Sequence, residues 1–517
     1  MRTPSLTLLL ALSACGFENL PNQSSYSADL PLWDPDVISL NDAVYVMLPQ
    51  ARELARVHPT EGWSVVDLNG LTPSRLVATP DREGVIVFGS YPTCTETDPK
   101  IETVEDCEDL DGEIELVHEV ALVRGGEVIS SAQVAAHFNA VSFTNDGAQA
   151  ALHLNYDSGA DIEVTGVSDL TQVLFMDLAT GVITPVAVGF AADRILFNAD
   201  DSKAVVLSRG EVLVIELTSG DYDIEVRFPL SLDVDVQVRP RDVALTPDGT
   251  YALVTVTGDE SLYVLDLEQE SINIVPLSAA PTAMVVDAVA DRSIFVYENS
   301  AVVEILEHDL FEIETVPLDE AMNQIQSLAG EALLYSTAGR KDAYVLDLGT
   351  GDYDELRLEN PPSALELSPD KTLALAITRP EVSGASGLDA WYDSNWGVEI
   401  IDLVDRENLP LVAESEPLAV AFTADATTPT ALVLLADSLD LMQLDLARRT
   451  ASPVELEAPA LGLDRFGESS FVIVNNAPFG LLSFLDPATG EITAVGGFAT
   501  AGILQGEQPL PRLAEEE

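Results

Sequence analysis

The chain has 517 residues, 47% of them hydrophobic, which is ample material for an extensive core. It carries 87 acidic side chains against 24 Lys and Arg, a formal net charge of −63. A surface of this charge repels nucleic-acid phosphates and anionic lipid headgroups. We therefore expect no nucleic-acid partner and no docking of the folded body on an anionic bilayer.

The N-terminus has the pattern of an export signal. Arg2 precedes the apolar run Leu6–Leu12, which is too short to span a bilayer. Leu12-Ser13-Ala14-Cys15 resembles the lipobox of bacterial lipoproteins. The resemblance implies a signal peptide over residues 1–14, acylation (palmitate) at Cys15, and a membrane anchor. Gly16 after the cysteine implies an outer-membrane lipoprotein facing the periplasm or the surface. An ordinary signal peptide with an incidental cysteine is the alternative.

Residues 15–36 are rich in Pro, Ser and Asn and are interpreted as a flexible tether. Residues 37–504 are interpreted as the folded body and residues 505–517 as an acidic, disordered tail. Cys94 and Cys107 are the remaining cysteines. In an exported protein such a pair predicts a disulfide rather than a metal or redox site.

The stretch Arg241–Ser278 shows the repeat unit most plainly. Its four short apolar runs are Val243–Leu245, Tyr251–Thr257, Leu262–Leu267 and Ile272–Leu277, separated by tight turns. Such a pattern predicts a four-stranded antiparallel meander. A lone sheet of this kind leaves apolar faces uncovered, so it needs neighbours like itself.

Two marks of this unit recur along the chain with a basic period near 40 residues. An apolar run ending in Asp is found at Asp67, Asp177, Asp266, Asp347, Asp402, Asp445 and Asp486, with degenerate copies near Val120, Glu216 and Leu306. A turn of the Thr-Pro-Asp-Gly type is found at Asp81, Asp146, Asp248, Asp370 and Asp425. Ten units can be counted in this way.

Four strands per repeat, copied many times, predict an all-β fold, a single β-propeller of antiparallel blades. The Pro-Asp-Gly turns and Leu-Asp-Leu strands resemble the YVTN/WD40-like repeats of exported bacterial proteins over Val37–Phe498. Ten units exceed the usual blade number of such rings, so we expect between about seven and ten blades.

Long insertions interrupt the repeat at one kind of place. If the strands of a unit are named a to d from the axis outward, the b–c connection is short in most units. It is long at Pro49–Gly62, Ser90–Gly112, Tyr156–Thr171 and Arg379–Asn395. Because strand directions alternate, all four insertions are predicted to emerge on one face. Long loops on a compact scaffold often carry function, so this face is the predicted binding surface, with loops of no role as the alternative.

The insertions differ in composition. Gln50–Val57 reads as a short basic helix with Arg52 and Arg56. Trp391, Tyr392 and Trp396 suit a protein contact or sugar stacking, or could fold back over the channel mouth.

A third insertion carries the candidate metal ligands Asp106, Asp109 and Asp111. They suggest a loose calcium site, although Cys107 and His118 stand where an EF-hand loop needs oxygen ligands. A solvated run of charge is the alternative. We expect no cofactor, with calcium at this loop as the alternative.

Catalytic motifs are scarce. The histidines are His58, His118, His137, His153 and His308, without metal-ligand spacing, and there is no Gly-x-Ser-x-Gly or Walker A sequence. The leading hypothesis is a monomeric, lipid-anchored envelope protein that binds a protein or an envelope glycan without catalysis. A lactonase-like propeller hydrolase with a carboxylate-bound divalent metal, and a carbohydrate-binding module, are the alternatives.

Overall fold

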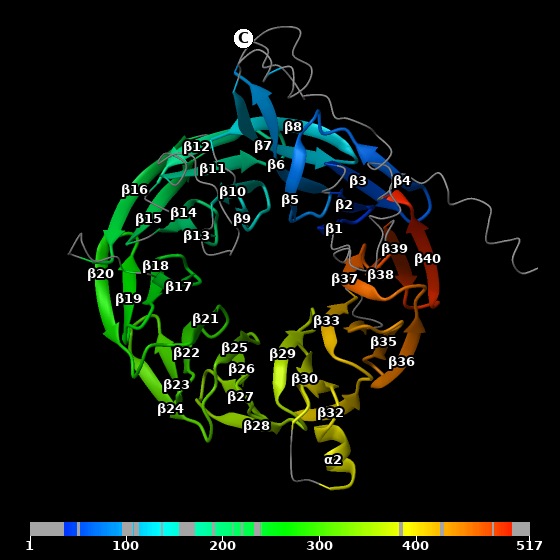
Figure 1. The fold of residues 1–517 in the computed structure, drawn as a ribbon. Helices are drawn as coiled ribbons and strands as arrows, with labels where there is room; N and C mark the ends of the chain where they lie inside the picture. Colours follow the sequence, from blue (N-terminus) through cyan, green and yellow to red (C-terminus); the bar gives the residue numbers. More distant parts are fainter. Residues whose placement is uncertain are drawn as a thin grey trace, which may run out of the picture.

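The computed structural model of the chain is a β-propeller of ten four-stranded antiparallel blades arranged in a ring (Figure 1). It describes residues 36–498 except 49–51, 96–106, 108–112, 136–137, 155–170, 189–191, 209, 219–220, 232–237, 239, 382–385, 424–428 and 478–479. The predicted fold class is confirmed, at the upper end of the expected range of blade number.

Each blade consists of four consecutive strands, and blades are numbered 1 to 10 in chain order. Blades 1 to 5 comprise β1 Val37–Ser39, β2 Val44–Leu48, β3 Glu53–His58 and β4 Gly62–Val66; β5 Thr72–Ala78, β6 Gly84–Cys94, β7 Ile114–Arg124 and β8 Glu127–Val134; β9 Ala140–Phe143, β10 Gln149–His153, β11 Gln172–Asp177 and β12 Ile183–Ala187; β13 Ala192–Phe197, β14 Lys203–Ser208, β15 Glu211–Thr218 and β16 Asp221–Pro229; and β17 Pro240–Leu245, β18 Tyr251–Val256, β19 Ser261–Asp266 and β20 Ser271–Pro276. Blades 6 to 10 comprise β21 Ala283–Asp287, β22 Arg292–Tyr297, β23 Ser300–Glu307 and β24 Ile313–Pro317; β25 Gln324–Ser327, β26 Glu331–Tyr335, β27 Asp342–Asp347 and β28 Tyr353–Arg357; β29 Pro362–Leu367, β30 Leu373–Thr378, β31 Gly397–Asp402 and β32 Glu407–Val412; β33 Pro417–Phe422, β34 Thr430–Leu435, β35 Asp440–Asp445 and β36 Thr450–Glu455; and β37 Ala460–Phe466, β38 Ser470–Asn475, β39 Leu481–Asp486 and β40 Glu491–Gly496. A short helix, α2 Leu388–Asp393, interrupts blade 8 between β30 and β31.

Within a blade, the two middle strands are more buried than the innermost and outermost strands. In blade 5, five consecutive residues of β18 are buried, whereas the outermost strand β20 buries Val275 alone. The two middle strands are covered on both faces by neighbouring blades, and they are therefore nearly continuous apolar runs rather than alternating ones. One apolar cluster fills each of the ten gaps between adjacent blades.

The ring closes without a strand shared between its two ends. Blade 1 comes wholly from the N-terminal end of the described chain and blade 10 wholly from its C-terminal end, and they lie side by side (Figure 1). Val44 and Val46 of β2 pack in one buried cluster with Phe484 of β39. Ser39 Oγ also donates to the carbonyl oxygen of Arg465 at 2.7 Å. Apolar packing and a few polar contacts therefore hold the closure.

The contacts within the a–b turns explain the recurrence of the Thr-Pro-Asp-Gly pattern. In blade 5, Thr246 Oγ1 donates to Asp248 Oδ1 at 2.6 Å and accepts from the Tyr251 amide at 3.1 Å. Gly249 adopts a φ of 72°, which strains any other residue. Burial raises the pKa of Asp248, but hydrogen bonds from Thr246 and Thr250 outweigh it and hold that pKa below its usual value.

The repeated aspartates that end most c strands cap the c–d turns. Asp347 Oδ1 accepts from the amides of Gly349 and Thr350 at 2.8 and 2.9 Å. These hydrogen bonds stabilise the ionised form and lower the pKa of Asp347. The same contacts recur at Asp177, Asp266, Asp402 and Asp486. The Leu-Asp-Leu mark is therefore a structural feature of the turn.

The prediction for the first unit was wrong. Gln50–Val57 was expected to be a helix within a b–c insertion, but Glu53–His58 is the strand β3 of blade 1. Leu54, Ala55 and Val57 are fully buried, so packing between blades overrides their helical composition. The predicted insertion Pro49–Gly62 is consequently absent, and the run ending at Asp67 is the fourth strand β4 rather than the third.

Candidate binding face

Three of the four predicted insertions lie in b–c connections, as expected. They separate β6 from β7, β10 from β11, and β30 from β31. In an antiparallel four-stranded blade, b–c and d–a connections share one face, and a–b and c–d connections share the other. We call these the insertion face and the turn face.

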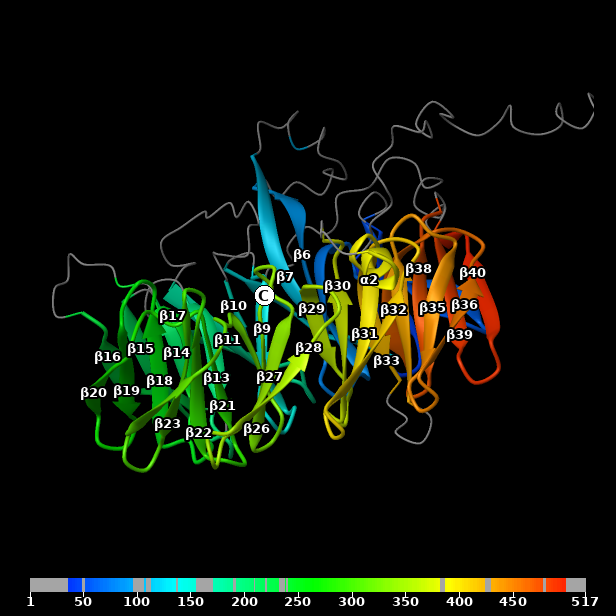
Figure 2. The same ribbon diagram turned by 90° about the horizontal axis from the view of Figure 1, so that it is seen from below.

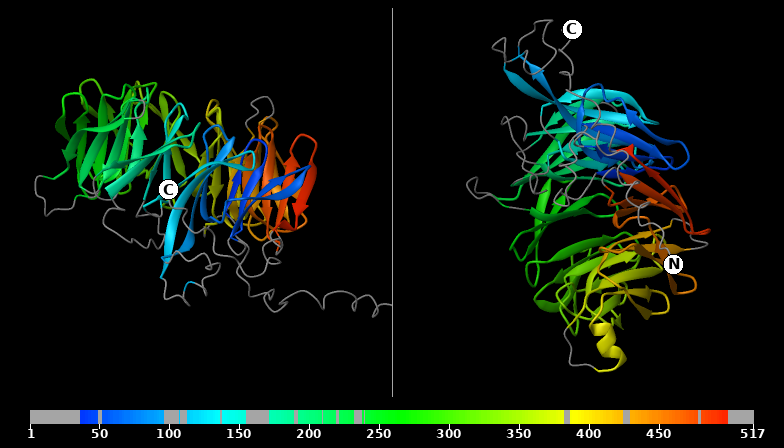
Figure 3. Two further views of the ribbon diagram at one scale, coloured as in Figure 1. Left: turned by 90° about the horizontal axis from the view of Figure 1, so that it is seen from above. Right: turned by 45° about the vertical axis from the view of Figure 1, so that its right-hand side comes forward.

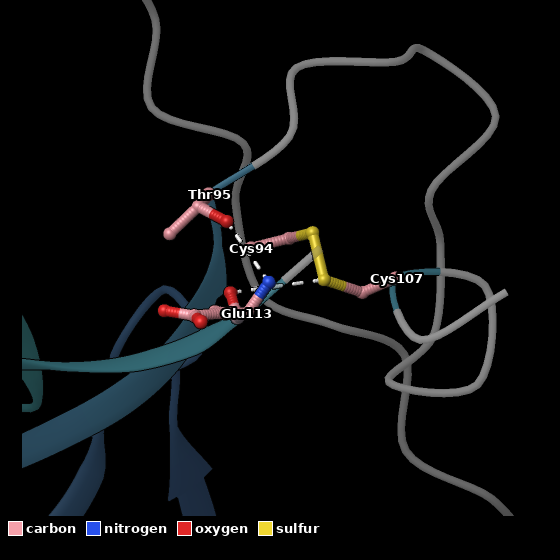
Figure 4. The surroundings of a disulfide bond; sticks show 4 residues. All are labelled: Cys94, Thr95, Cys107 and Glu113. Atoms are coloured by element: carbon pink, nitrogen blue, oxygen red, sulfur yellow. Dashed lines mark hydrogen bonds between the residues drawn. A yellow bond between two sulfur atoms is a disulfide. The ribbon is translucent and has the colours of Figure 1, made fainter. Parts of the chain in front are cut away.

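The insertion of blade 2 extends two strands into a projecting hairpin, here called the arm, formed by Tyr91–Thr95 and Glu113–Val117. β6 and β7 each have 11 residues and pair along their whole length. Figure 2 shows the arm rising beyond the ring. A disulfide links Cys94 and Cys107, as predicted, with a Cα–Cα distance of 5.9 Å (Figure 4).

The insertion of blade 8 carries α2, which lies across the ring from the arm (Figures 1 and 3). Buried Asp393 at the end of α2 accepts from Lys341 Nζ at 3.1 Å, and Glu381 pairs with the same ammonium at 3.1 Å. Burial opposes the charge of Lys341, but the two carboxylates outweigh it and raise its pKa. Asn360 Nδ2 donates to the Tyr392 carbonyl at 2.7 Å. Side chains from blade 7 and from the 7–8 connection thus fix α2.

A buried carboxylate stabilises the connection between blades 7 and 8, which contacts α2. Glu399 of β31 accepts from the amides of Glu359 and Asn360 at 2.7 and 3.2 Å, and from Asn408 Nδ2 at 2.7 Å. Burial raises the pKa of Glu399 despite these donors. Glu399 therefore anchors the d–a connection that carries Asn360.

The three aromatic candidates of this insertion do not gather into one platform. Trp391 on α2 is 50% exposed, and its ring makes an edge contact with Tyr392 at a centroid distance of 5.3 Å. Trp396 is partly buried and packs into the apolar core between blades 8 and 9. A ligand can therefore reach Trp391, whereas Trp396 contributes to packing.

The two arginine candidates lie in blade 1. Arg56 is in β3 and pairs with Asp42 at 2.9 Å and with Glu61 at 3.9 Å. Arg52 is exposed just before β3, with a φ of 53°. Neither belongs to a long insertion.

Several candidates lie outside the described residues: Cys15 with the signal and tether, Asp106, Asp109, Asp111 and His137. Among the described residues of 36–498, which leave out the gaps given above, no group of three or more His, Cys, Asp or Glu is placed to hold a metal. Over that same part of the chain, no helix is long and apolar enough to cross a membrane.

One polar constellation was missed. In blade 6, His308 Nδ1 lies 2.8 Å from Asp291 Oδ1, and His308 Nε2 lies 2.8 Å from Ser293 Oγ. The connectivity is that of a Ser-His-Asp triad, but Ser293 has no exposed surface and His308 is 5% exposed. No substrate can reach the hydroxyl in this conformation, so the contacts join the a–b turn to the c–d turn.

Comparison among blades would have revealed this cluster. Ser293 of β22 is paired with Leu306 of β23. The equivalent positions hold Ala252 in blade 5 and Ala332 in blade 7, each paired with a Leu of the third strand. The His308 position holds Leu267 and Leu348 in those same blades. Blade 6 thus replaces an apolar pair with a hydrogen-bonded one.

No known protein family matches the chain, and no curated protein is similar to it in sequence. Solved structures show only a low similarity to it. The dihydro-heme d1 dehydrogenase NirN, in complex with DHE, is 13% identical over 69% of this chain and 80% of its own, with a TM-score of 0.40. Kuenenia stuttgartiensis hydrazine synthase is 10% identical over 66% of this chain and 99% of its own, with a TM-score of 0.34. A protein of unknown function from Desulfotomaculum acetoxidans is 11% identical over 56% of this chain and 93% of its own, with a TM-score of 0.34.

Proposed function

We propose that this propeller is a lipid-anchored envelope protein that binds a macromolecular partner, without catalysis, through its insertion face. The observation that carries the proposal is the concentration of added structure on that face. A disulfide-linked arm and a helix fixed by Lys341 and Asn360 both depart from the repeat there. Rigid scaffolds with elaborated loops on one face are typical of binding proteins.

Photo-crosslinking in the native cell envelope tests whether the partner binds to the insertion face. A photoreactive residue replaces Leu116 on the arm or Trp391 on α2, which are 59% and 50% exposed. Matched positions on the turn face are Leu310 and Val404, which are 64% and 70% exposed. We expect discrete adducts from the first pair and none from the second. Adducts from both faces alike, or from the turn face alone, would refute the proposal.

Lipid anchoring rests on the sequence and has its own test. Cys15→Ser should move the protein from the membrane fraction to the soluble fraction and abolish labelling with a palmitate analogue. Persistent labelling would show that Cys15 is not acylated.

A carbohydrate-binding function is the second candidate, favoured by the exposed ring of Trp391. Trp391→Ala should then abolish binding to purified envelope glycan, whereas Trp396→Phe, which alters a partly buried ring, should not. Unchanged glycan binding by Trp391→Ala would remove this candidate.

A further inference from the structure

We propose that the arm binds an extended, basic segment of a partner protein by strand addition along the outer edge of β7, at Ile114–Val117. The inference rests on the proposed binding role of the insertion face and names the chemistry of one partner.

Among the described residues, one backbone edge of the arm pairs with no other strand. β6 pairs with β5 only as far as Ser90, and β7 pairs with β8 only from His118 onward. No other described strand pairs with Ile114–Val117. Beyond the ring, the arm is thus a two-stranded ribbon, and a strand added beside β7 would continue the line of β8.

The hydrogen-bond pattern determines which backbone groups point outward. Thr95 N donates to Glu113 O at 3.0 Å, so this is a hydrogen-bonded pair. Pairs alternate along an antiparallel ladder, so Cys94–Ile114 and Pro92–Leu116 are non-hydrogen-bonded pairs. The N–H and C=O groups of Ile114 and Leu116 therefore point away from β6, toward the open edge.

The two edges of the arm are not equivalent. On the β6 side, the outward position opposite Leu116 is Pro92, which has no N–H to donate. Six of the ten outermost blade strands also contain a proline, a common protection against edge pairing: Pro185, Pro229, Pro276, Pro317, Pro410 and Pro453. Ile114–Val117 contains none, so the β7 edge of the arm is able to pair.

Side chains at this edge favour a polypeptide. Leu116 and Ile114 are 59% and 38% exposed and share one face of the ribbon. Strand addition combines backbone hydrogen bonds with apolar contacts at alternate positions. An incoming strand with apolar residues at every second position would cover both side chains.

Charge selects a basic segment over a second copy of this chain. Glu113 and Glu115 are both exposed on the arm, next to the open edge of β7. Two arms placed edge to edge would bring these like charges together, which is destabilising. A partner strand with Lys or Arg between its apolar residues would be attracted.

The test uses the full soluble chain (Cys15→Ser) and a fluorescent peptide of alternating Lys and Val, about eight residues long. We expect saturable binding by anisotropy, with slowed amide exchange at Ile114 and Leu116. The same peptide with N-methylated backbone groups, and an alternating Glu-Val peptide, should bind at least about tenfold more weakly. No binding of the Lys-Val peptide up to millimolar concentration would overturn the proposal.

Two variants separate the edge from the rest of the ring. Leu116→Pro removes one outward donor and should weaken binding by about tenfold or more. Ile274→Pro is the matched control, because Ile274 is 58% exposed on the outer strand β20 and should leave binding unchanged. If Leu116→Pro lowers the melting temperature, Leu116→Asp serves instead. It keeps the backbone N–H and tests the apolar contact of the side chain with the peptide. Equal loss in Leu116→Pro and Ile274→Pro would refute the assignment.

Failure of the strand-addition proposal can be distinguished from failure of the proposed binding function. Arm-to-arm dimers, detected as a concentration-dependent mass that Leu116→Pro abolishes, would replace the partner strand with a second copy. Crosslinks at Trp391 without peptide binding would leave the binding face standing and reject strand addition. Turn-face crosslinks alone would reject the proposed function instead.

Discussion

The two faces of the ring differ in the contacts that hold their connections. The turn face repeats one hydrogen-bonding scheme in several blades: a Thr or Ser and an Asp close the a–b turn, and a second Asp caps the c–d turn, as at Thr246, Asp248 and Asp347. Among the described residues of the insertion face, the contacts that hold α2 occur once, such as that of Lys341 with Asp393. The comparison indicates that the repeated Asp residues of the turn face stabilise the fold, which agrees with the proposed binding role of the insertion face.

The largest effect is expected at the turn face, where Asp287 joins blades 6 and 7. It is fully buried and accepts from the amides of Ala290 and Gly330 and from Ser327 Oγ, at 2.7 to 3.1 Å. In Asp287→Asn, the new NH2 group is a donor placed against the amide and hydroxyl donors that the carboxylate accepted from. We expect a loss of about 3–4 kcal/mol in the free energy of unfolding at neutral pH. Urea denaturation measures it.

The same residue predicts a pH dependence. Burial raises the pKa of Asp287, but its donors outweigh burial and the net pKa is lowered. A lowered folded-state pKa stabilises the fold above the unfolded value, near 4, and this contribution is lost as pH falls through the folded value. The stability gap between wild type and Asp287→Asn should therefore narrow below about pH 4. A gap independent of pH would contradict the assignment.

The insertion face should respond next, through the disulfide of the arm. Replacing both Cys94 and Cys107 with Ser releases a constraint on the unfolded chain and should lower stability by about 2–3 kcal/mol. Circular dichroism should still report an intact ring, because no inter-blade cluster contains the disulfide. Loss of the β-sheet signal at room temperature would show that the ring depends on the arm.

A smaller effect is expected from one repeated turn. Asp248→Ala removes an acceptor for Thr246 and Thr250 and should cost about 1 kcal/mol, measured by thermal melting. Asp309→Ala, an exposed turn residue of blade 6, should change little. Equal losses would mean that overall charge, rather than the turn contacts, determines the result.

The smallest effect is expected from restoring the repeat in blade 6. Ser293→Ala together with His308→Leu recreates the pair found in blades 5 and 7, and should change stability by less than about 1 kcal/mol or increase it. His308→Ala alone should cost about 2 kcal/mol, since it leaves Ser293 without its partner and opens a cavity. A large loss in the double variant would reveal a role for the polar cluster beyond packing.

The features that could be predicted from the sequence are those that depend on contacts between residues close together in the chain. Thr246 and Asp248 bond within five residues of each other and of Tyr251, so the motif alone predicts the turn. The Cys94–Cys107 pair is also local, and it was predicted correctly.

Contacts that depend on register or tertiary packing were not predictable. Glu53–His58 has helix-forming residues, but burial between blades makes it a strand. Ser293 and His308 meet only because β22 and β23 pair in one register. Trp391 and Trp396 are close in sequence, yet the end of α2 separates an exposed ring from a packed one.

Because the ring closes through contacts between blades 1 and 10 and not through a shared strand, the order of the blades along the chain is open to change. Since every blade is made of four consecutive strands, no blade depends on segments from both ends of the chain. The covalent order could be opened between any two blades and rejoined at residues 37 and 496 without dividing a sheet. Circular permutants cut at different d–a connections should therefore fold to the same ring, and duplication of one blade-length segment would lengthen the ring without rethreading it.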